Sequence, residues 1–137
     1  ITLVGGVICQ PLIGILLDRM NKRLLMNIAV FCTFVCPIII GVFLGNFYLV
    51  ALSCFVWGGA ASGIFSISLT MLGERYTASQ VAGATAILVM VFECGSLIGP
   101  MIGGRVMDIF GPFGFIYTIV FFTFIFLMIS IYRTIRN

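Results

Sequence analysis

Residues 113–132 read FGFIYTIVFFTFIFLMISIY, and none of these side chains is charged. A helix needs about 20 mainly apolar residues to cross the roughly 30 Å hydrocarbon core of a bilayer, and this stretch has that length. Lipid cannot hydrogen-bond to backbone N–H and C=O groups, so an apolar segment satisfies them internally by forming a helix. The stretch therefore predicts a membrane-spanning helix.

Four further apolar stretches precede this one, separated by short segments of charged and turn-forming residues. Taken together, the predicted spans cover residues 1–17, 24–44, 47–72, 82–107 and 113–132. Thr77 and Gln80 have the spacing of a capping box, which predicts a helix start just before the fourth span. Because the first span opens at Ile1 without a charged flank, we expect it to be the remainder of a helix that starts upstream. The sequence thus predicts an all-α fold, a polytopic bundle of five membrane-spanning helices.

The composition of the chain fits the same environment. Of its 137 residues, 62% are hydrophobic and 8% are charged, whereas soluble domains contain roughly 45–50% apolar and about 25% charged residues. So few charges cannot cover a globular surface, which argues against a soluble enzyme and against a nucleic-acid partner. The chain has no histidine, which removes His-based acid–base catalysis and the commonest ligand of zinc and haem. We expect no enzymatic activity and no cofactor.

The cysteines lie inside apolar runs and are interpreted as small apolar side chains rather than as disulfide or metal ligands. Cys32 and Cys36 are four residues apart and could face one metal ion, but no further cysteine, histidine or acid stands near them. We therefore expect no metal site. The five positions are Cys9, Cys32, Cys36, Cys54 and Cys94.

The basic residues predict how the chain is oriented in the membrane. On an alternating path, Arg105 falls toward one side, and the other six lysines and arginines fall toward the opposite side. Cytoplasmic loops carry the excess of basic residues, so this second side and the C-terminus should be cytoplasmic. We expect an integral, multi-pass protein of a bacterial cytoplasmic (inner) membrane. The six residues are Arg19, Lys22, Arg23, Arg75, Arg133 and Arg136.

A short internal repeat accompanies this topology. Gly14 precedes Asp18 by four residues, and Gly104 precedes Asp108 by the same distance. The two copies are three spans apart, so they should lie on opposite membrane faces. An inverted repeat of three-helix units has this property.

The segment 14–23 reads GILLDRMNKR and resembles the loop signature G-x-x-x-D-R-x-G-R-R of the major facilitator superfamily (MFS). Asn21 stands where the signature has glycine, and asparagine enters the left-handed backbone region more readily than most residues. In that family the signature follows helices 2 and 8. Four spans follow it here, so the chain resembles helices 8 to 12, a partial C-terminal half covering residues 1–137. The matching positions are Gly14, Asp18, Arg19, Lys22 and Arg23.

A second motif lies in the fourth span and is similar to the glycine-proline pattern of MFS helix 5 and its counterpart, helix 11. It would serve helix packing or a helix kink. Residues 73–76, which precede that span, are similar to the helix 10–11 loop in a poorly characterised branch of bacterial MFS permeases. The glycine-proline motif consists of Gly95, Gly99, Pro100, Gly103 and Gly104.

The resemblance implies a secondary transporter that moves a small solute by alternating access, in which two six-helix halves rock around a central site. Its partners would be the lipid bilayer, an unspecified small-molecule substrate, a proton if transport is coupled, and the missing N-terminal half. The alternative is a non-transporting membrane subunit or a degenerate fragment that only packs beside other helices.

The loop motif has a physical role that does not depend on the family. Gly14 lets a neighbouring helix approach, and Asp18 on the same helix face can accept hydrogen bonds from that helix's free N–H groups. In the family this neighbour is helix 5, which the chain lacks. We predict that Glu74, the other acid on this side, forms an ion pair with Arg19 or Arg23. The alternative is that the basic residues are solvated and only anchor the topology.

Glu93 lies near the middle of the fourth span, where an ionised acid costs at least roughly 2.5–3.5 kcal/mol. One interpretation is that Glu93 faces the central cavity, where a low-dielectric setting favours its protonated form, and binds a proton or a cationic part of the substrate. The other is that it forms a neutral hydrogen bond to an adjacent helix. The sequence leaves both open.

Polar residues of the third span are further candidates. Ser62 and Ser66 recur at helical spacing, and MFS helix 10 borders the cavity, so these serines and Trp57 are candidates for substrate contact. The alternative is close helix packing, with the hydroxyl groups bonded to their own backbone. Gln10, in an apolar part of the first span, has a similar status.

Overall fold

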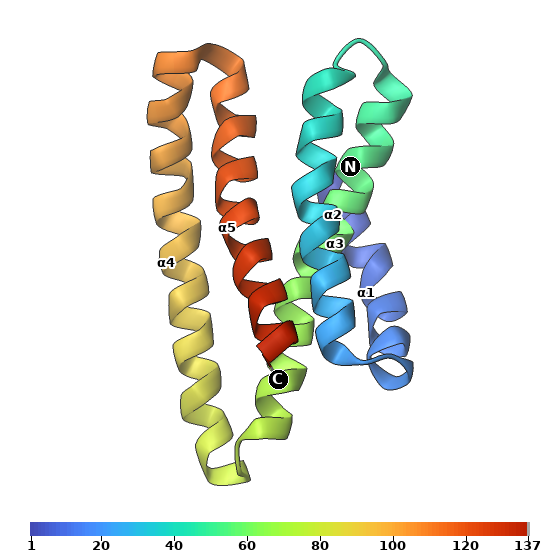
Figure 1. The fold of residues 1–137 in the computed structure, drawn as a ribbon, viewed down its shortest axis with the longest axis vertical. Coiled ribbons are helices and arrows are strands. Elements are labelled where there is room, and N and C mark those ends of the chain that lie inside the picture. Colours follow the sequence, from blue (N-terminus) through green and yellow to red (C-terminus); the bar gives the residue numbers. More distant parts are fainter. Residues whose placement is uncertain (137) are drawn as a thin grey trace.

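The computed structural model describes residues 1–136, and these form five long α-helices and no strand (Figure 1). The predicted all-α class is therefore confirmed. A short 3₁₀ turn, η1 (Gly111–Phe113), joins the last two helices. The helices are α1 (Thr2–Arg19), α2 (Lys22–Val42), α3 (Phe47–Arg75), α4 (Ala78–Phe110) and α5 (Gly114–Arg136).

Four continuous helical segments of the described chain are long and apolar enough to cross a membrane. The last of them, residues 78–136, contains both α4 and α5, which run antiparallel because the chain reverses at η1 (Figure 1). Gly111 enters this reversal with a φ of +69°, a conformation that side chains with a Cβ rarely adopt. The five predicted spans therefore correspond to five helices.

The helices run alternately up and down, so the ends of the molecule differ in charge. The α1–α2 connection, the α3–α4 connection and the C-terminal end of α5 lie toward one end of the bundle, and the other two connections lie at the opposite end (Figure 1). The first end carries six of the seven basic residues. Helices α1 and α4, which contain the two copies of the repeat, run in opposite directions (Figure 1).

Two of the helix starts differ in detail from the sequence-based expectation. Asn21 is the N-cap of α2, with an extended backbone and a side chain that accepts a hydrogen bond from the Arg23 N–H at 3.0 Å. It thus contributes a cap, and the left-handed conformation expected at this position is absent. Thr77 is the N-cap of α4 as expected, but its hydroxyl lies 3.2 Å from the Ser79 hydroxyl and makes no capping bond.

Helices α1 and α3 cross in close contact through glycine. A Cβ added to Gly5 would overlap the backbone of Phe55, and one added to Gly58 would overlap the backbone of Thr2. Small residues of this kind let helix backbones approach, which increases dispersion contact between helices in lipid. The glycines therefore fix α1 against α3.

The buried core lies where α1, α2 and α3 meet, around Leu17, Leu25, Ala29 and Ile67. Helix α5 packs on α2, partly through Phe34 and Phe124, whose ring centroids are 5.9 Å apart. Helix α4 packs mainly on α5 and leaves most of its own side chains exposed. The structure is thus a compact three-helix group with α5 and α4 added along one side (Figure 1).

Candidate functional site

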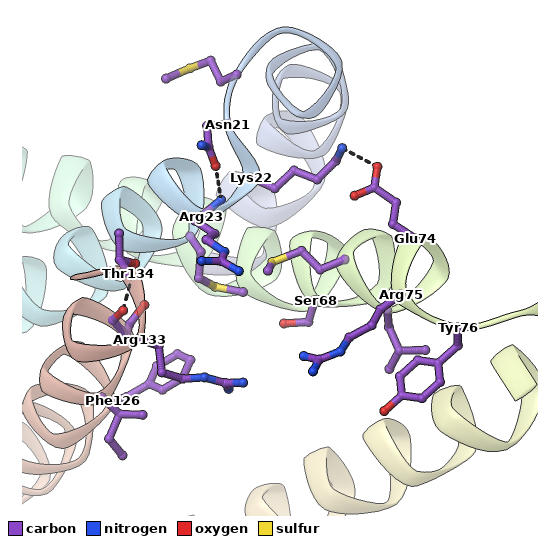
Figure 2. Close-up of a pocket in the computed structure, with 16 residues that line it drawn as sticks. Asn21, Lys22, Arg23, Ser68, Glu74, Arg75, Tyr76, Phe126, Arg133 and Thr134 are labelled. Atoms are coloured by element: carbon purple, nitrogen blue, oxygen red, sulfur yellow. Dashed lines mark hydrogen bonds and ion pairs between the residues drawn. The ribbon is translucent and has the colours of Figure 1, made fainter. Parts of the chain in front are cut away.

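An ion pair from the loop motif links α2 to α3. Lys22, the first residue of α2, lies with its Nζ 2.5 Å from Oε1 of Glu74, in the last turn of α3. The predicted partner of Glu74 was Arg19 or Arg23, so the acid is correct and the cation is wrong. Figure 2 shows the reason: Lys22 extends toward Glu74, whereas the Arg23 side chain is directed into the pocket between the helix ends.

The other half of the loop motif finds no helix within the described residues. A Cβ added to Gly14 would meet no atom within 4 Å, and Asp18 is exposed. The close approach predicted for Gly14 is therefore not made inside this chain. The helix expected to approach Gly14 stays a prediction.

Glu93 is exposed on α4, and its hydrogen-bond partner is on its own helix. The Ser96 hydroxyl lies 3.3 Å from Oε2 of Glu93 and donates at 2.8 Å to the Glu93 backbone oxygen. The packing alternative, a hydrogen bond from Glu93 to an adjacent helix, is not realised among residues 1–136. Glu93 thus projects from the five-helix bundle. Ser96 was not predicted as its partner, although its position three residues after Glu93 on the same helix was the available signal.

The serines of α3 are bonded to helix backbone. The Ser62 hydroxyl donates to the Gly59 oxygen at 3.0 Å and lies 3.4 Å from the Gly6 oxygen of α1. The Ser66 hydroxyl lies 3.4 Å from the backbone oxygen of Ser62. Ser62 therefore sits in the α1–α3 contact, an arrangement typical of packing rather than of a solute-lining surface.

The same contact contains two more glycines of α3. A Cβ added to Gly59 would lie 2.6 Å from the Cys9 sulfur, and one added to Gly63 would lie 2.7 Å from Cδ1 of Ile13. Both residues are buried. Gln10, one residue after Cys9, is exposed and takes no part in this contact.

Trp57 and most of the glycine-proline motif line one apolar cleft of about 590 Å³ between α3, α4 and α5. Phe115 and Phe122 of α5 form much of the opposite wall. Gly104 does not line the cleft, and Gly95, Gly99 and Gly104 would each accept a Cβ without a contact inside 4 Å. The motif residues in the cleft are Gly95, Gly99, Pro100 and Gly103.

This proximity of Trp57 to the glycine-proline motif was not predicted, because the two segments are far apart in the sequence. The hydroxyl groups of Thr118 and Thr123, also in the cleft, donate to backbone oxygens of their own helix. The cleft therefore presents an almost wholly apolar surface, suited to a hydrophobic group or a helix.

A second pocket, of about 950 Å³, lies between the basic ends of α2, α3 and α5 (Figure 2). Four cations and one acid line it: Lys22, Arg23, Arg75, Arg133 and Glu74. From the sequence, Lys22 and Arg23 were assigned to the loop motif and Arg75 and Arg133 were interpreted as topology signals, but no shared pocket was predicted. Their spacing along the chain gave no sign that they converge, because they come from three different helices.

Beside this pocket, α2 and α5 share a polar network that the sequence analysis also missed. The Asn27 amide nitrogen donates to the Thr134 hydroxyl at 3.1 Å, and the Ser130 hydroxyl donates to the Asn27 side-chain oxygen at 2.5 Å. An amide in an otherwise apolar span was the available signal, since such groups seek hydrogen bonds to other helices.

Comparison with known proteins identifies the same family as the loop motif does. A sequence model of the Major Facilitator Superfamily matches residues 1–136. An uncharacterised MFS-type transporter of Yersinia enterocolitica is 30% identical over 104 residues, which are 76% of this chain and 26% of that protein. The uncharacterised MFS-type transporter YfkF of Bacillus subtilis is 25% identical over 116 residues, 85% of this chain and 29% of that protein. No solved structure matches the chain.

The chain thus spans less than a third of the length of these curated relatives. The family model covers all five helices, including the loop motif after α1 and the glycine-proline motif of α4. On this match, the chain belongs to the major facilitator superfamily of membrane transporters.

Proposed function

We propose that the complete protein is a secondary active transporter that moves a small solute across a cytoplasmic membrane by alternating access. The observation that carries this proposal is the match of the transporter family to residues 1–136. The chain would contribute the last five helices, numbers 8 to 12, of the second half. The basic end, with the C-terminus, would face the cytoplasm.

The packing of the helices supports a rocking mechanism. Alternating access needs each half to move largely as a rigid body around a fixed site. The close α1–α3 contact at Gly59 and Gly63 favours movement as one body, and the exposed Lys22–Glu74 pair adds a weak link between α2 and α3. The open surface around Gly14 and Asp18 is where another part of the transporter would bind and release as the halves move.

Among the candidate residues, Glu93 is the strongest for binding a proton or a cationic part of the solute. It projects from the bundle at the middle of α4 and is bonded only to Ser96 of the same helix, so it is accessible to a ligand or a helix outside this chain. Trp57 would contribute an apolar wall on the α3 side of the nearby cleft. Ser66, Ser62 and Gln10 are weaker candidates, since the serines are satisfied by helix backbone.

The test is solute uptake by the complete protein reconstituted in proteoliposomes, screened across solute classes with and without a pH gradient. We expect saturable uptake of at least one class. No uptake with a correctly folded, complete protein would contradict the proposal and support a non-transporting membrane subunit instead. Catalytic turnover of a solute without its translocation would likewise contradict it.

The role of Glu93 is tested by Glu93→Gln in the same assay, with Gln80→Ala as the control, because Gln80 is an exposed polar residue of the same helix outside the Glu93–Ser96 hydrogen bond. If Glu93 binds the coupling proton, the Glu93→Gln variant loses pH-driven accumulation but retains downhill exchange. Unchanged uptake with unchanged pH dependence would remove Glu93 from the coupling mechanism.

A further inference from the structure

We propose that the pocket between the basic ends of α2, α3 and α5 binds the phosphate group of an anionic phospholipid. The pocket is separate from the apolar cleft beside Trp57 and lies at the opposite boundary from η1. The proposal goes beyond transport itself. It concerns a lipid site at the edge of the transporter.

The charges of the pocket favour an anion. Lys22, Arg23, Arg75 and Arg133 carry four positive charges and Glu74 carries one negative charge, so the formal charge of the lining is +3. Each arginine comes from a different helix, and Figure 2 shows Arg75 and Arg133 reaching into the same space from opposite sides. Cations brought together in this way repel one another, and a bound anion removes that repulsion.

The chemistry of the donors favours a phosphate group. A guanidinium presents a planar fork of N–H donors that matches the oxygens of phosphate. The nearby hydroxyls are already engaged: Ser68 donates to the Ile64 oxygen and Ser130 to Asn27. The guanidinium groups that line the pocket, those of Arg23, Arg75 and Arg133, are the donors whose geometry matches a phosphate group.

The apolar part of the pocket favours a lipid as the source of that phosphate. The lining also contains apolar side chains: Met26, Met71, Leu72, Phe126 and Ile129. Tyr76, at the rim, is an aromatic residue of the type that gathers at the headgroup level. A ligand with a phosphate at one end and acyl chains at the other fits this arrangement, and basic pockets between helix ends on the cytoplasmic side bind such headgroups.

The experiment measures lipid binding to the complete protein in detergent, titrating phosphatidylglycerol and, separately, phosphatidylcholine in mixed micelles. We expect saturable binding of phosphatidylglycerol and at least about tenfold weaker binding in the double variant Arg75→Gln/Arg133→Gln, as the loss of charge-assisted hydrogen bonds implies. Arg136→Gln is the matched control, because Arg136 lies on the same helix end but does not line the pocket. It should bind like the natural protein.

Each other outcome overturns the proposal. If the two lipids bind equally well, the charge of the headgroup does not determine binding. If Arg136→Gln weakens binding as much as the double variant does, the effect comes from the net charge of the protein and not from the pocket. If inorganic phosphate alone saturates the site and displaces the lipid at similar concentration, the ligand is a free anion. If the natural protein binds no lipid, the pocket is filled by another part of the transporter. Should the Gln variant misfold, Arg75→Lys/Arg133→Lys keeps the charge and removes the fork, and unchanged affinity would again contradict the proposal.

Discussion

At the scale of single residues, the Lys22–Glu74 pair shows what the loop motif does within this chain. The Lys22 side chain is 27% exposed and the Glu74 side chain 59% exposed, so water and salt weaken their attraction. A double-mutant cycle with Lys22→Gln and Glu74→Gln should give a coupling of at most about 1 kcal/mol in unfolding free energy. The coupling should fall when salt is raised. A coupling that is absent at low salt, or that is insensitive to salt, would show that the pair does not hold α2 against α3.

The partner of Glu74 shows what could not be predicted from the sequence. The motif predicted a cation paired with Glu74, but which cation depends on where each side chain leaves the turn after α1. Asn21 is the N-cap of α2, and its side chain accepts a hydrogen bond from the Arg23 N–H, so α2 begins at Lys22. This cap sets the direction in which the Lys22 side chain leaves the turn. The prediction treated Asn21 as a substitute for a flexible glycine, so it missed both the cap and its consequence for Lys22.

At the scale of helices, the α1–α3 contact depends on the absence of side chains on α3. In Gly58→Val and Gly59→Val, new atoms would collide with the backbone of Thr2 and with Cys9, and overpacking of this kind costs about 1–3 kcal/mol. The measurement is thermal unfolding of the complete protein in detergent. Gly83→Val is the matched control, because a Cβ there meets no atom within 4 Å. Equal unfolding temperatures for the three variants would contradict a close α1–α3 contact.

The α2–α5 contact depends on the polar network of Asn27. Replacing Asn27 with Leu removes two interhelical hydrogen bonds, which should lower the unfolding free energy by about 0.6 kcal/mol for each bond, or about 1.2 kcal/mol in total. Chemical unfolding of the complete protein measures the change. Asn46→Leu would not serve as a control, because Asn46 caps α3. Gln10→Leu does, since Gln10 is exposed and outside the network, and it should change stability less than Asn27→Leu.

Helix positions were predictable from the sequence, whereas helix neighbours were only partly so. Apolar length and charged breaks located all five helices, because hydrocarbon thickness and backbone hydrogen bonding act on each segment alone. Close helix packing was one of the alternatives for the third span, but nothing in the sequence indicated that α1 would be the partner. The convergence of Arg23, Arg75 and Arg133 arises only after three helices pack, so no local pattern could reveal it.

At the scale of the whole molecule, the alternating direction of the helices places most of the basic residues at one end of the bundle. Six of the seven basic residues lie at one end, where the loop motif, the Lys22–Glu74 pair and the basic pocket also lie. If the chain crosses the bilayer with each helix, this end is a single membrane face. The proposals on the loop motif, the orientation and the lipid site all require that arrangement.

Accessibility of single cysteines tests this arrangement most directly. The five native cysteines of the chain would be replaced, and one cysteine introduced at Asn46, between α2 and α3, or at Ser79, at the start of α4. An impermeant thiol reagent should label the Asn46→Cys variant from outside intact cells and the Ser79→Cys variant only in inside-out vesicles. Labelling of both positions from the same side would contradict the alternating crossings, because α3 would then not span the membrane.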